Sequence, residues 1–283
     1  MSDPRPGALV SVDWLAEHLP DPQLRVVDGS WHMPVLKRDP QAEFLAAHIP
    51  GAVYFDIDSI ADTSSALPHM VPTDEVFGDA VGRLGIGNDD QVVVYDANGN
   101  GSAARVWWMF RLFGHERVSV LDGGLSRWQA QGLDTQAGEP AAAMAQFVAR
   151  RNASLLRTVD DLMANLDSGA EQVLDARSAG RFTASEPEPR AGLRGGRIPG
   201  SFNQPFIDLY DPDTRTLRPV EELASLFDAS GVDRGAPIVT SCGSGVTACN
   251  LALGLYLVGK TDVAVYDGSW TEWGGREDTP VEA

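Results

Sequence analysis

The sequence predicts an α/β protein of two tandem domains, each built on a mainly parallel sheet with helices on both faces. The chain has 283 residues, which is long for one hydrophobic core and suits two domains of ordinary size. Residues 92–128 match residues 237–273 without a gap, an offset of 145 residues (237 minus 92). In each half, short apolar runs rich in β-branched residues alternate with helix-like segments, the pattern of a buried parallel sheet.

The elements of the two copies follow one another in the same order. Ahead of the long match, 25-RVVDGSW-31 corresponds to 172-QVLDARS-178, and 48-HIPGAVYFDI-57 corresponds to 197-RIPGSFNQPF-206. Short β-branched runs predict strands, and the longer segments between them predict helices. The predicted strands are 26–27, 92–94 and 118–121 in the first copy, and 173–174, 238–240 and 263–266 in the second.

A linker is expected between the two copies. Residues 134–146 carry Gly, Pro and small side chains with few large apolar ones, which is typical of a surface connection. We therefore expect a first domain over 1–134, a linker over 135–153 and a second domain over 154–283.

Charge and composition restrict the classes of partner. The formal net charge is −18, whereas proteins that bind nucleic acids or anionic membranes need a basic surface. The first residues lack the pattern of a secretion signal, and no run approaches the roughly 18 apolar residues of a membrane span. We expect a cytoplasmic protein that binds neither nucleic acid nor membrane.

Cysteine and histidine usage argues against a metal site or a disulfide framework. The chain has 2 Cys and 5 His, without a Cys-x-x-Cys pair or a His pair at metal-binding spacing. We expect no metal and no cofactor.

The segment 238-IVTSCGSGVTACNLALGLYL-257 contains the strongest candidate for a reactive group. Cys242 follows a predicted strand and precedes a predicted helix, the place where ligands bind in open α/β sheets. Backbone N–H groups of this loop, together with the start of the helix at about Thr247, would favour an anionic sulfur. The residues of the anion-cradling loop are Gly243, Ser244, Gly245, Val246 and Thr247.

Two other interpretations of this loop have to be considered. A lone Cys is often a small buried residue, which is the better expectation for Cys249 within the helix. For Cys242 the first copy weakens that alternative, because it has Ala97 at the equivalent position and so does not need a thiol there. A phosphatase loop needs an Arg six residues after the Cys, where this chain has Ala248.

Positive charge is concentrated in the segment 177–197, which has the Gly and Pro content of a long functional loop. Because Arg makes paired hydrogen bonds to carboxylates, one or two of these arginines could hold an anionic substrate beside Cys242. For Arg194 and Arg197 the alternative is a solvated loop in which they pair with Glu186 and Glu188. The arginines of the segment are Arg177, Arg181, Arg190, Arg194 and Arg197.

The first copy contributes a second candidate group in the segment 55–70. Asp56, Asp58 and His69 lie in this loop, and a carboxylate that orients a His is a common acid–base device. The alternative is that His69 is a surface residue without a catalytic role.

Taken together, these motifs resemble the two-domain rhodanese family of sulfurtransferases, and within it the 3-mercaptopyruvate sulfurtransferase branch. The resemblance covers nearly the whole chain. It is carried by 28-DGSW-31, 48-HIPGAVYFDID-58, 67-LPHM-70, 105-RVWWMFRLFGH-115, 121-LDGGLSRW-128, 181-RFTASEPEPR-190, 241-SCGSGVTAC-249 and 266-YDGSW-270.

The resemblance implies two tandem rhodanese domains, of which the second is catalytic and the first lacks the Cys. It implies that Cys242 is the nucleophile that forms a persulfide. It implies further that Arg181 and Arg190 bind the substrate, and that Ser244, His69 and Asp58 form a proton relay.

The residues after the Cys distinguish two branches of this family. Thiosulfate-preferring relatives resemble this chain but carry Arg and Lys there, whereas this chain has Gly243 and Ser244, and Arg190 closes its Glu-Pro-Glu-Pro segment. The resemblance therefore implies 3-mercaptopyruvate as the substrate, pyruvate as a product, and a thiol such as thioredoxin, or cyanide, as the sulfur acceptor. A thiosulfate:cyanide sulfurtransferase and a non-enzymatic persulfide carrier are the alternatives.

Overall fold

The computed structural model describes residues 7–99, 101–141 and 143–283, and these residues form two compact units. Unit 1 contains the described residues up to Asp62 together with Val71–Arg151 and Asp211–Leu217. Unit 2 contains Thr63–Met70, Asn152–Tyr210 and Arg218–Ala283. Each unit thus includes a short segment from the other half of the sequence.

Unit 1 is built on a five-stranded sheet in the order β1-β5-β4-β2-β3, in which every pairing is parallel. The central strand β4 is buried throughout and is β-branched at three of its five positions, which suits a strand covered on both faces. The strands are β1 Leu9–Val10, β2 Leu24–Asp28, β3 Val53–Tyr54, β4 Gln91–Tyr95 and β5 Val118–Leu121.

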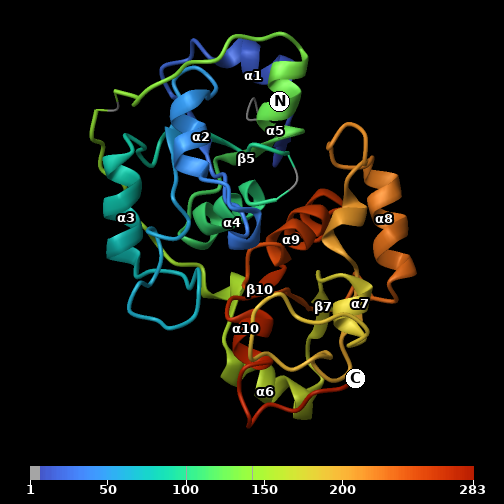
Figure 1. The fold of residues 1–283 in the computed structure, drawn as a ribbon. Helices are drawn as coiled ribbons and strands as arrows, with labels where there is room; N and C mark the ends of the chain where they lie inside the picture. The colour runs from blue at the N-terminus through green and yellow to red at the C-terminus, as the bar shows by residue number, and fades with distance from the viewer. Residues whose placement is uncertain (1–6, 100, 142) are drawn as a thin grey trace. The chain divides into compact units, whose positions relative to one another are not determined.

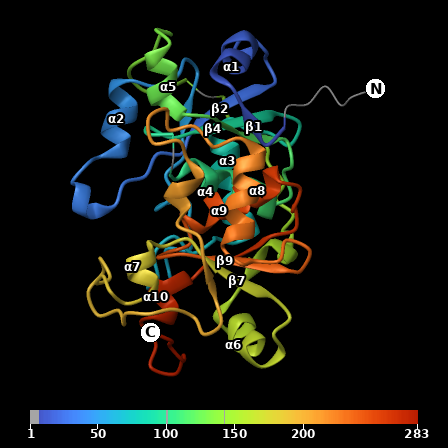
Figure 2. The same cartoon turned by 90° about the vertical axis from the view of Figure 1, so that its right-hand side faces the viewer.

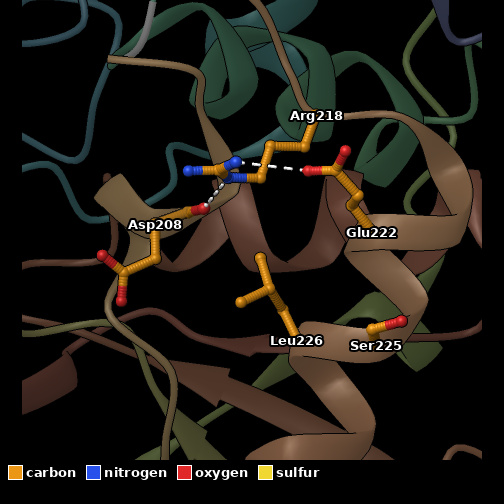
Figure 3. Close-up of a pocket in the computed structure, with 5 residues that line it drawn as sticks. All are labelled: Asp208, Arg218, Glu222, Ser225 and Leu226. Carbon is orange, nitrogen blue, oxygen red and sulfur yellow. Dashed lines mark hydrogen bonds and ion pairs between the residues drawn. The ribbon is translucent and has the colours of Figure 1, made fainter.

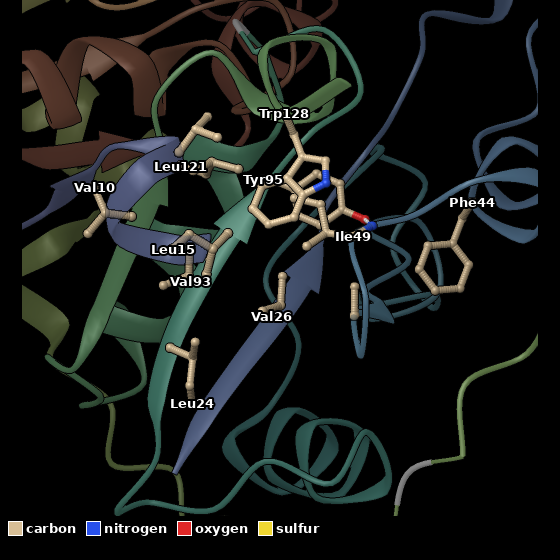
Figure 4. Close-up of a cluster of buried hydrophobic side chains, with 12 residues drawn as sticks. Val10, Leu15, Leu24, Val26, Phe44, Ile49, Val93, Tyr95, Leu121 and Trp128 are labelled. Carbon is tan, nitrogen blue, oxygen red and sulfur yellow. Dashed lines mark hydrogen bonds between the residues drawn. The ribbon is translucent and has the colours of Figure 1, made fainter. Parts of the chain in front are cut away.

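Helices cover both faces of this sheet because successive side chains of β4 point to opposite sides. Val93 belongs to a core cluster that includes Leu15 of α1 and Trp128 of α5 (Figure 4). Val94, the next residue, packs near Val106 of α4 around Gly29. The helical segments of unit 1 are α1 Val12–His18, η1 Pro34–Leu36, α2 Pro40–Ala46, α3 Asp74–Arg83, α4 Ala103–Leu112 and α5 Gly124–Ala130.

Unit 2 repeats this architecture with a parallel five-stranded sheet in the order β6-β10-β9-β7-β8. Strand for strand this is the order found in unit 1, which confirms the predicted repeat and fold class. The strands are β6 Leu156–Arg157, β7 Gln172–Asp175, β8 Phe202–Asn203, β9 Ile238–Ser241 and β10 Ala264–Tyr266.

The helices of unit 2 also lie on both faces of its sheet. Leu162 of α6 and Trp270 of α10 pack with Val239 of β9 in one cluster. On the other side, α8 and α9 lie side by side (Figures 1 and 2), and Gly254 of α9 lets the helices approach closely beside Phe227. The helical segments are η2 Ala153–Leu155, α6 Val159–Ser168, α7 Ala179–Phe182, η3 Phe206–Leu209, α8 Val220–Ala229, α9 Ala248–Leu257 and α10 Ser269–Trp273.

Among the described residues, no helix is both long enough and apolar enough to cross a membrane.

Candidate functional site

The candidate nucleophile lies in the loop that joins β9 to α9. Strand β9 ends at Ser241, Cys242 follows it directly, and α9 begins at Ala248 after the N-cap residue Thr247. Gly245 has a φ of 76°, a left-handed conformation that glycine adopts without strain. The loop therefore lies at the carboxyl end of a central parallel strand, where the sequence predicts the site, and Cys242 is only 1 % exposed.

The start of α10 holds Cys242 in place. Ser269 Oγ accepts the N–H of Cys242 at 3.1 Å, donates its own proton to the carbonyl of Tyr266 at 2.8 Å, and lies 4.0 Å from Cys242 Sγ. The N–H of Trp270 donates to the carbonyl of Cys242 at 2.9 Å, and Thr271 donates to the carbonyl of Gly243 through both N–H and Oγ1. No sequence pattern predicts this contribution of α10.

Ser269 adopts an unusual backbone conformation. Its φ is 48° although it is not glycine, and its side chain is fully buried. At the equivalent position, 145 residues earlier, unit 1 has Gly124 with a φ of 57°. A non-glycine residue in the left-handed region costs roughly 1–2 kcal/mol. A serine at this strained position therefore indicates that its hydroxyl has a role at the site.

The structure brings Arg181 and Arg190 to the Cys242 loop. A methyl group placed on Gly243 would lie 3.2 Å from Arg181 Nη2 and 3.7 Å from Arg190 Nη1. Arg190 Nη2 also donates to Ser244 Oγ at 3.3 Å. Two guanidinium groups and a hydroxyl thus lie next to the candidate nucleophile, an arrangement that can bind an anion.

A network of buried charges lies behind Arg181. Arg177 is fully buried, bonds to Asp175 at 2.6 Å and to Glu188 at 2.7 Å, and lies 4.1 Å from the centre of the Trp270 ring. Burial alone would lower the pKa of Arg177, but the two carboxylates outweigh it and raise the pKa above its ordinary value. The sequence places Arg177 in the cationic segment without showing that it supports the site.

The proposed pairing of Arg194 and Arg197 with Glu186 and Glu188 is wrong. Arg194 donates to the carbonyls of Trp273, Gly274 and Thr279 and to the Thr279 hydroxyl, and Arg197 pairs with Glu282. These arginines tie the loop to the C-terminal segment. Glu186 accepts a hydrogen bond from Ser178 Oγ, and Glu188 binds Arg177 and Arg181.

His69 and Asp58 belong to different compact units. His69 lies in the segment Thr63–Met70 of unit 2, the unit that contains Cys242, and Asp58 lies in unit 1, where it accepts a hydrogen bond from Trp31 Nε1 at 3.1 Å. His69 is 6 % exposed, so the alternative of a surface His is wrong. The proton relay through these two residues stays a prediction.

The corresponding loop of unit 1 encloses its own carboxylate. Asp96 accepts hydrogen bonds from four backbone N–H groups, which belong to Asn98, Gly99, Gly101 and Ala103, at 2.6–3.1 Å. In unit 2 the equivalent of Asp96 is Ser241. The donors that could stabilise an anionic sulfur in unit 1 are therefore already occupied by a side chain.

Two further features lie outside this site. Cys249 is fully buried in α9 and its thiol donates to the carbonyl of Gly245, as expected of a core residue. A surface pocket of about 440 Å³ is lined by residues of η3 and α8 and of the segment between them, and none of these residues belongs to the Cys242 loop (Figure 3). They are Asp208, Arg218, Glu222, Ser225 and Leu226.

Among the described residues, no group of three or more His, Cys, Asp or Glu side chains could hold a metal ion.

The two units are α/β domains of identical strand order. The second presents a buried cysteine in the loop after its central strand, with two arginines beside it. A family model described as the rhodanese-like domain matches residues 11–131 and 158–276. The chain belongs to this family, and the predicted resemblance is confirmed.

Relatives of this chain include several sulfurtransferases. The chain is 48 % identical over 272 residues to human 3-mercaptopyruvate sulfurtransferase, covering 94 % of this chain and 91 % of the relative. It is 47 % identical over 296 residues to thiosulfate/3-mercaptopyruvate sulfurtransferase 1, mitochondrial, of Arabidopsis thaliana, covering 97 % of this chain and 78 % of the relative. Thiosulfate sulfurtransferase of Bos taurus is 46 % identical over 94 % of this chain and 91 % of its own length.

A solved structure shows the same likeness. The crystal structure of SseA from Escherichia coli, described as a 3-mercaptopyruvate sulfotransferase with the rhodanese fold, superposes with a TM-score of 0.86 at 39 % identity. The match covers 94 % of this chain and 99 % of the SseA chain.

Proposed function

We propose that this chain is a 3-mercaptopyruvate sulfurtransferase whose nucleophile is Cys242. The names of the relatives do not decide between donors, because mercaptopyruvate and thiosulfate enzymes are similarly identical to the chain. The proposal depends on one observation. Arg181 and Arg190 both reach the Cys242 loop, while Gly243 and Ser244 leave it without charged side chains of its own.

In the proposed reaction, the Cys242 thiolate attacks the sulfur of 3-mercaptopyruvate. A sulfur–sulfur bond forms, the carbon–sulfur bond breaks, and its electron pair leaves on pyruvate as the enolate. Arg181 and Arg190 bind the carboxylate and ketone oxygens, and the N–H groups of the loop stabilise the charge on sulfur. Ser244 and His69, with Asp58, deliver the proton that converts the enolate to pyruvate.

The second half of the cycle transfers the outer sulfur of the persulfide to an acceptor. A thiol acceptor such as reduced thioredoxin, or cyanide, attacks the outer sulfur and restores the Cys242 thiolate. Covalent catalysis of this kind predicts ping-pong kinetics. We place this reaction in the cytoplasm. We assign the nucleophile to a catalytic domain 154–283, which a linker 135–153 joins to a domain 1–134 that lacks the Cys.

The test is the covalent intermediate. Incubation with 3-mercaptopyruvate should add the mass of one sulfur atom to the peptide that contains Cys242, and mass spectrometry of the digested protein measures it. Cys242→Ser should abolish both the adduct and pyruvate release, because the hydroxyl is not ionised near neutral pH. Cys249→Ser is the matched control and should keep most of the activity, because Cys249 lies in the helix core.

The same experiment distinguishes the alternatives. Adduct formation from thiosulfate at a higher kcat/KM than from mercaptopyruvate would identify a thiosulfate sulfurtransferase. Uptake of sulfur from a persulfide donor, without turnover of either small molecule, would identify a carrier. Pyruvate release by Cys242→Ser at the wild-type rate would refute the mechanism.

A further inference from the structure

Glu188 is a buried carboxylate held between two arginines beside the Cys242 loop. Its side chain is 2 % exposed. Its Oε1 accepts a hydrogen bond from Arg177 Nη1 at 2.7 Å, and its Oε2 accepts one from Arg181 Nη2 at 2.6 Å. Arg181 Nε adds longer bonds of 3.2 Å to both oxygens. Glu188 therefore engages two of the three guanidinium nitrogens of the arginine that approaches Gly243.

Arg177 fixes Glu188 at this position. The Arg177 guanidinium bonds to Asp175 through Nε and Nη2, donates to the carbonyl of Gly196, and stacks on the ring of Trp270. Because these contacts immobilise Arg177, the carboxylate that it binds is immobilised as well. The negative charge of Glu188 consequently stays next to Arg181 when an anion enters the site.

A fixed negative charge here discriminates between anions by their charge. Coulomb repulsion from Glu188 is twice as large for a dianion as for a monoanion at the same distance. Mercaptopyruvate carries one negative charge, on its carboxylate, whereas thiosulfate carries two negative charges. Charged groups inside a protein are screened less than groups in water, so this difference is felt across the width of Arg181.

We propose that Glu188 is a specificity-determining residue, which disfavours dianionic sulfur donors by offsetting the charge of Arg181. The inference rests on the proposed function and extends it from the arginines that attract an anion to the carboxylate that limits how much charge they accept. Glu188 acts through Arg181 and is a positioning residue for it.

The test compares two donors in matched variants. Glu188→Gln keeps the size of the side chain and removes its charge, so the ratio of kcat/KM for thiosulfate to kcat/KM for mercaptopyruvate should rise about tenfold with cyanide as the common acceptor. Glu186→Gln removes the same charge two residues away, from an exposed carboxylate bound by Ser178, and should keep the wild-type ratio. Glu188→Asp retains the charge and should also keep the ratio, while both kcat/KM values fall.

A ratio in Glu188→Gln equal to that in Glu186→Gln would overturn the proposal, as would an equal shift in Glu188→Asp, since packing alone would then explain it. If Glu188→Gln does not fold, the proposal is tested by inhibition of the wild-type protein with a monoanion, acetate, and a dianion, sulfate. Acetate should then compete more strongly than sulfate at equal ionic strength, and stronger competition by sulfate overturns the proposal. A wild-type protein that uses thiosulfate alone would refute the proposed function and leave the effect of Glu188→Gln on thiosulfate kcat/KM measurable.

Discussion

Ser269 combines a strained backbone with a contact to Cys242, and mutation can separate the two effects. Ser269→Ala keeps the left-handed conformation and removes the hydroxyl, whereas Ser269→Gly removes the hydroxyl and relieves the strain. We expect the Ala variant to be less stable than the Gly variant by about 1 kcal/mol. Both should lose turnover to the same extent, because both leave Cys242 without the hydroxyl that accepts its N–H. Thermal unfolding and kcat measure the two effects.

The outcome that contradicts this account is a variant that keeps the wild-type kcat. Turnover that follows stability, with Ser269→Gly more active than Ser269→Ala, would show that the residue acts only through folding. Equal turnover at unequal stability would show that the hydroxyl serves the reaction.

At this scale the sequence predicts the candidate reactive and substrate-binding residues, but not the residues that hold them in position. Cys242 and the arginines could be identified because their residue types and spacing are unusual. Ser269 and Glu188 could not, because a φ angle and a network of four charged residues exist only after the chain has folded. The one available signal for Ser269 is its alignment with Gly124 in the repeat.

At the scale of elements, the ends of β2 and β7 show how the two copies have diverged. Asp28 ends β2 and Asp175 ends β7, and the residue two positions later is Ser30 in one copy and Arg177 in the other. Asp175 therefore has a cationic partner at 2.6 Å, whereas Asp28 accepts the N–H of Ser30. Burial raises the pKa of Asp28 to about 6 in spite of that hydrogen bond.

This difference predicts a pH dependence of stability. A carboxyl group with a raised folded-state pKa binds its proton more tightly in the native protein, so its ionisation destabilises the fold above about pH 6 and the penalty disappears as the pH falls toward 4. Asp28→Asn cannot ionise and should gain on the wild type by about 3 kcal/mol at neutral pH, with the gain shrinking at low pH. Urea unfolding across this range measures it.

Asp175→Asn is the matched control in the other copy. It removes a buried partner of Arg177 and should destabilise unit 2 at neutral pH, the opposite sign from Asp28→Asn. A stability gain for Asp28→Asn that stays constant with pH would contradict the assignment.

The sequence predicts the central strands better than the edges. The runs at 92–94 and 238–240 lie within β4 and β9, where both faces are buried and the apolar pattern is continuous. The edge strands β1, β3, β6 and β8 have two residues each, which is too short for any periodic pattern. Similarly, α7 occupies four residues within a segment whose Gly and Pro content predicts a loop.

At the scale of the whole molecule, the equivalent loops of the two units differ in whether a carboxylate occupies their N–H groups. The loop of unit 1 is filled by Asp96, and the loop of unit 2 has Ser241 there and Cys242 next to it. A single replacement would not convert unit 1, since a thiol at position 97 would still find its N–H donors taken by a carboxylate. The asymmetry therefore involves at least two positions.

The two compact units are not separated cleanly along the chain, and this predicts the result of cutting the linker. Asp211–Leu217 belongs to unit 1 although it follows most of unit 2, and the N–H of Leu217 donates to Asp122 Oδ1 at 2.8 Å. Thr63–Met70, which contains His69, belongs to unit 2.

A protease site inserted after Glu139 should therefore give fragments that co-elute in gel filtration and keep sulfurtransferase activity, because each fragment supplies part of the other unit. The fragment from 140 onward expressed alone should be inactive, since it lacks His69. Fragments that separate after cutting, or a second fragment active by itself, would show that these segments do not matter to the units that contain them.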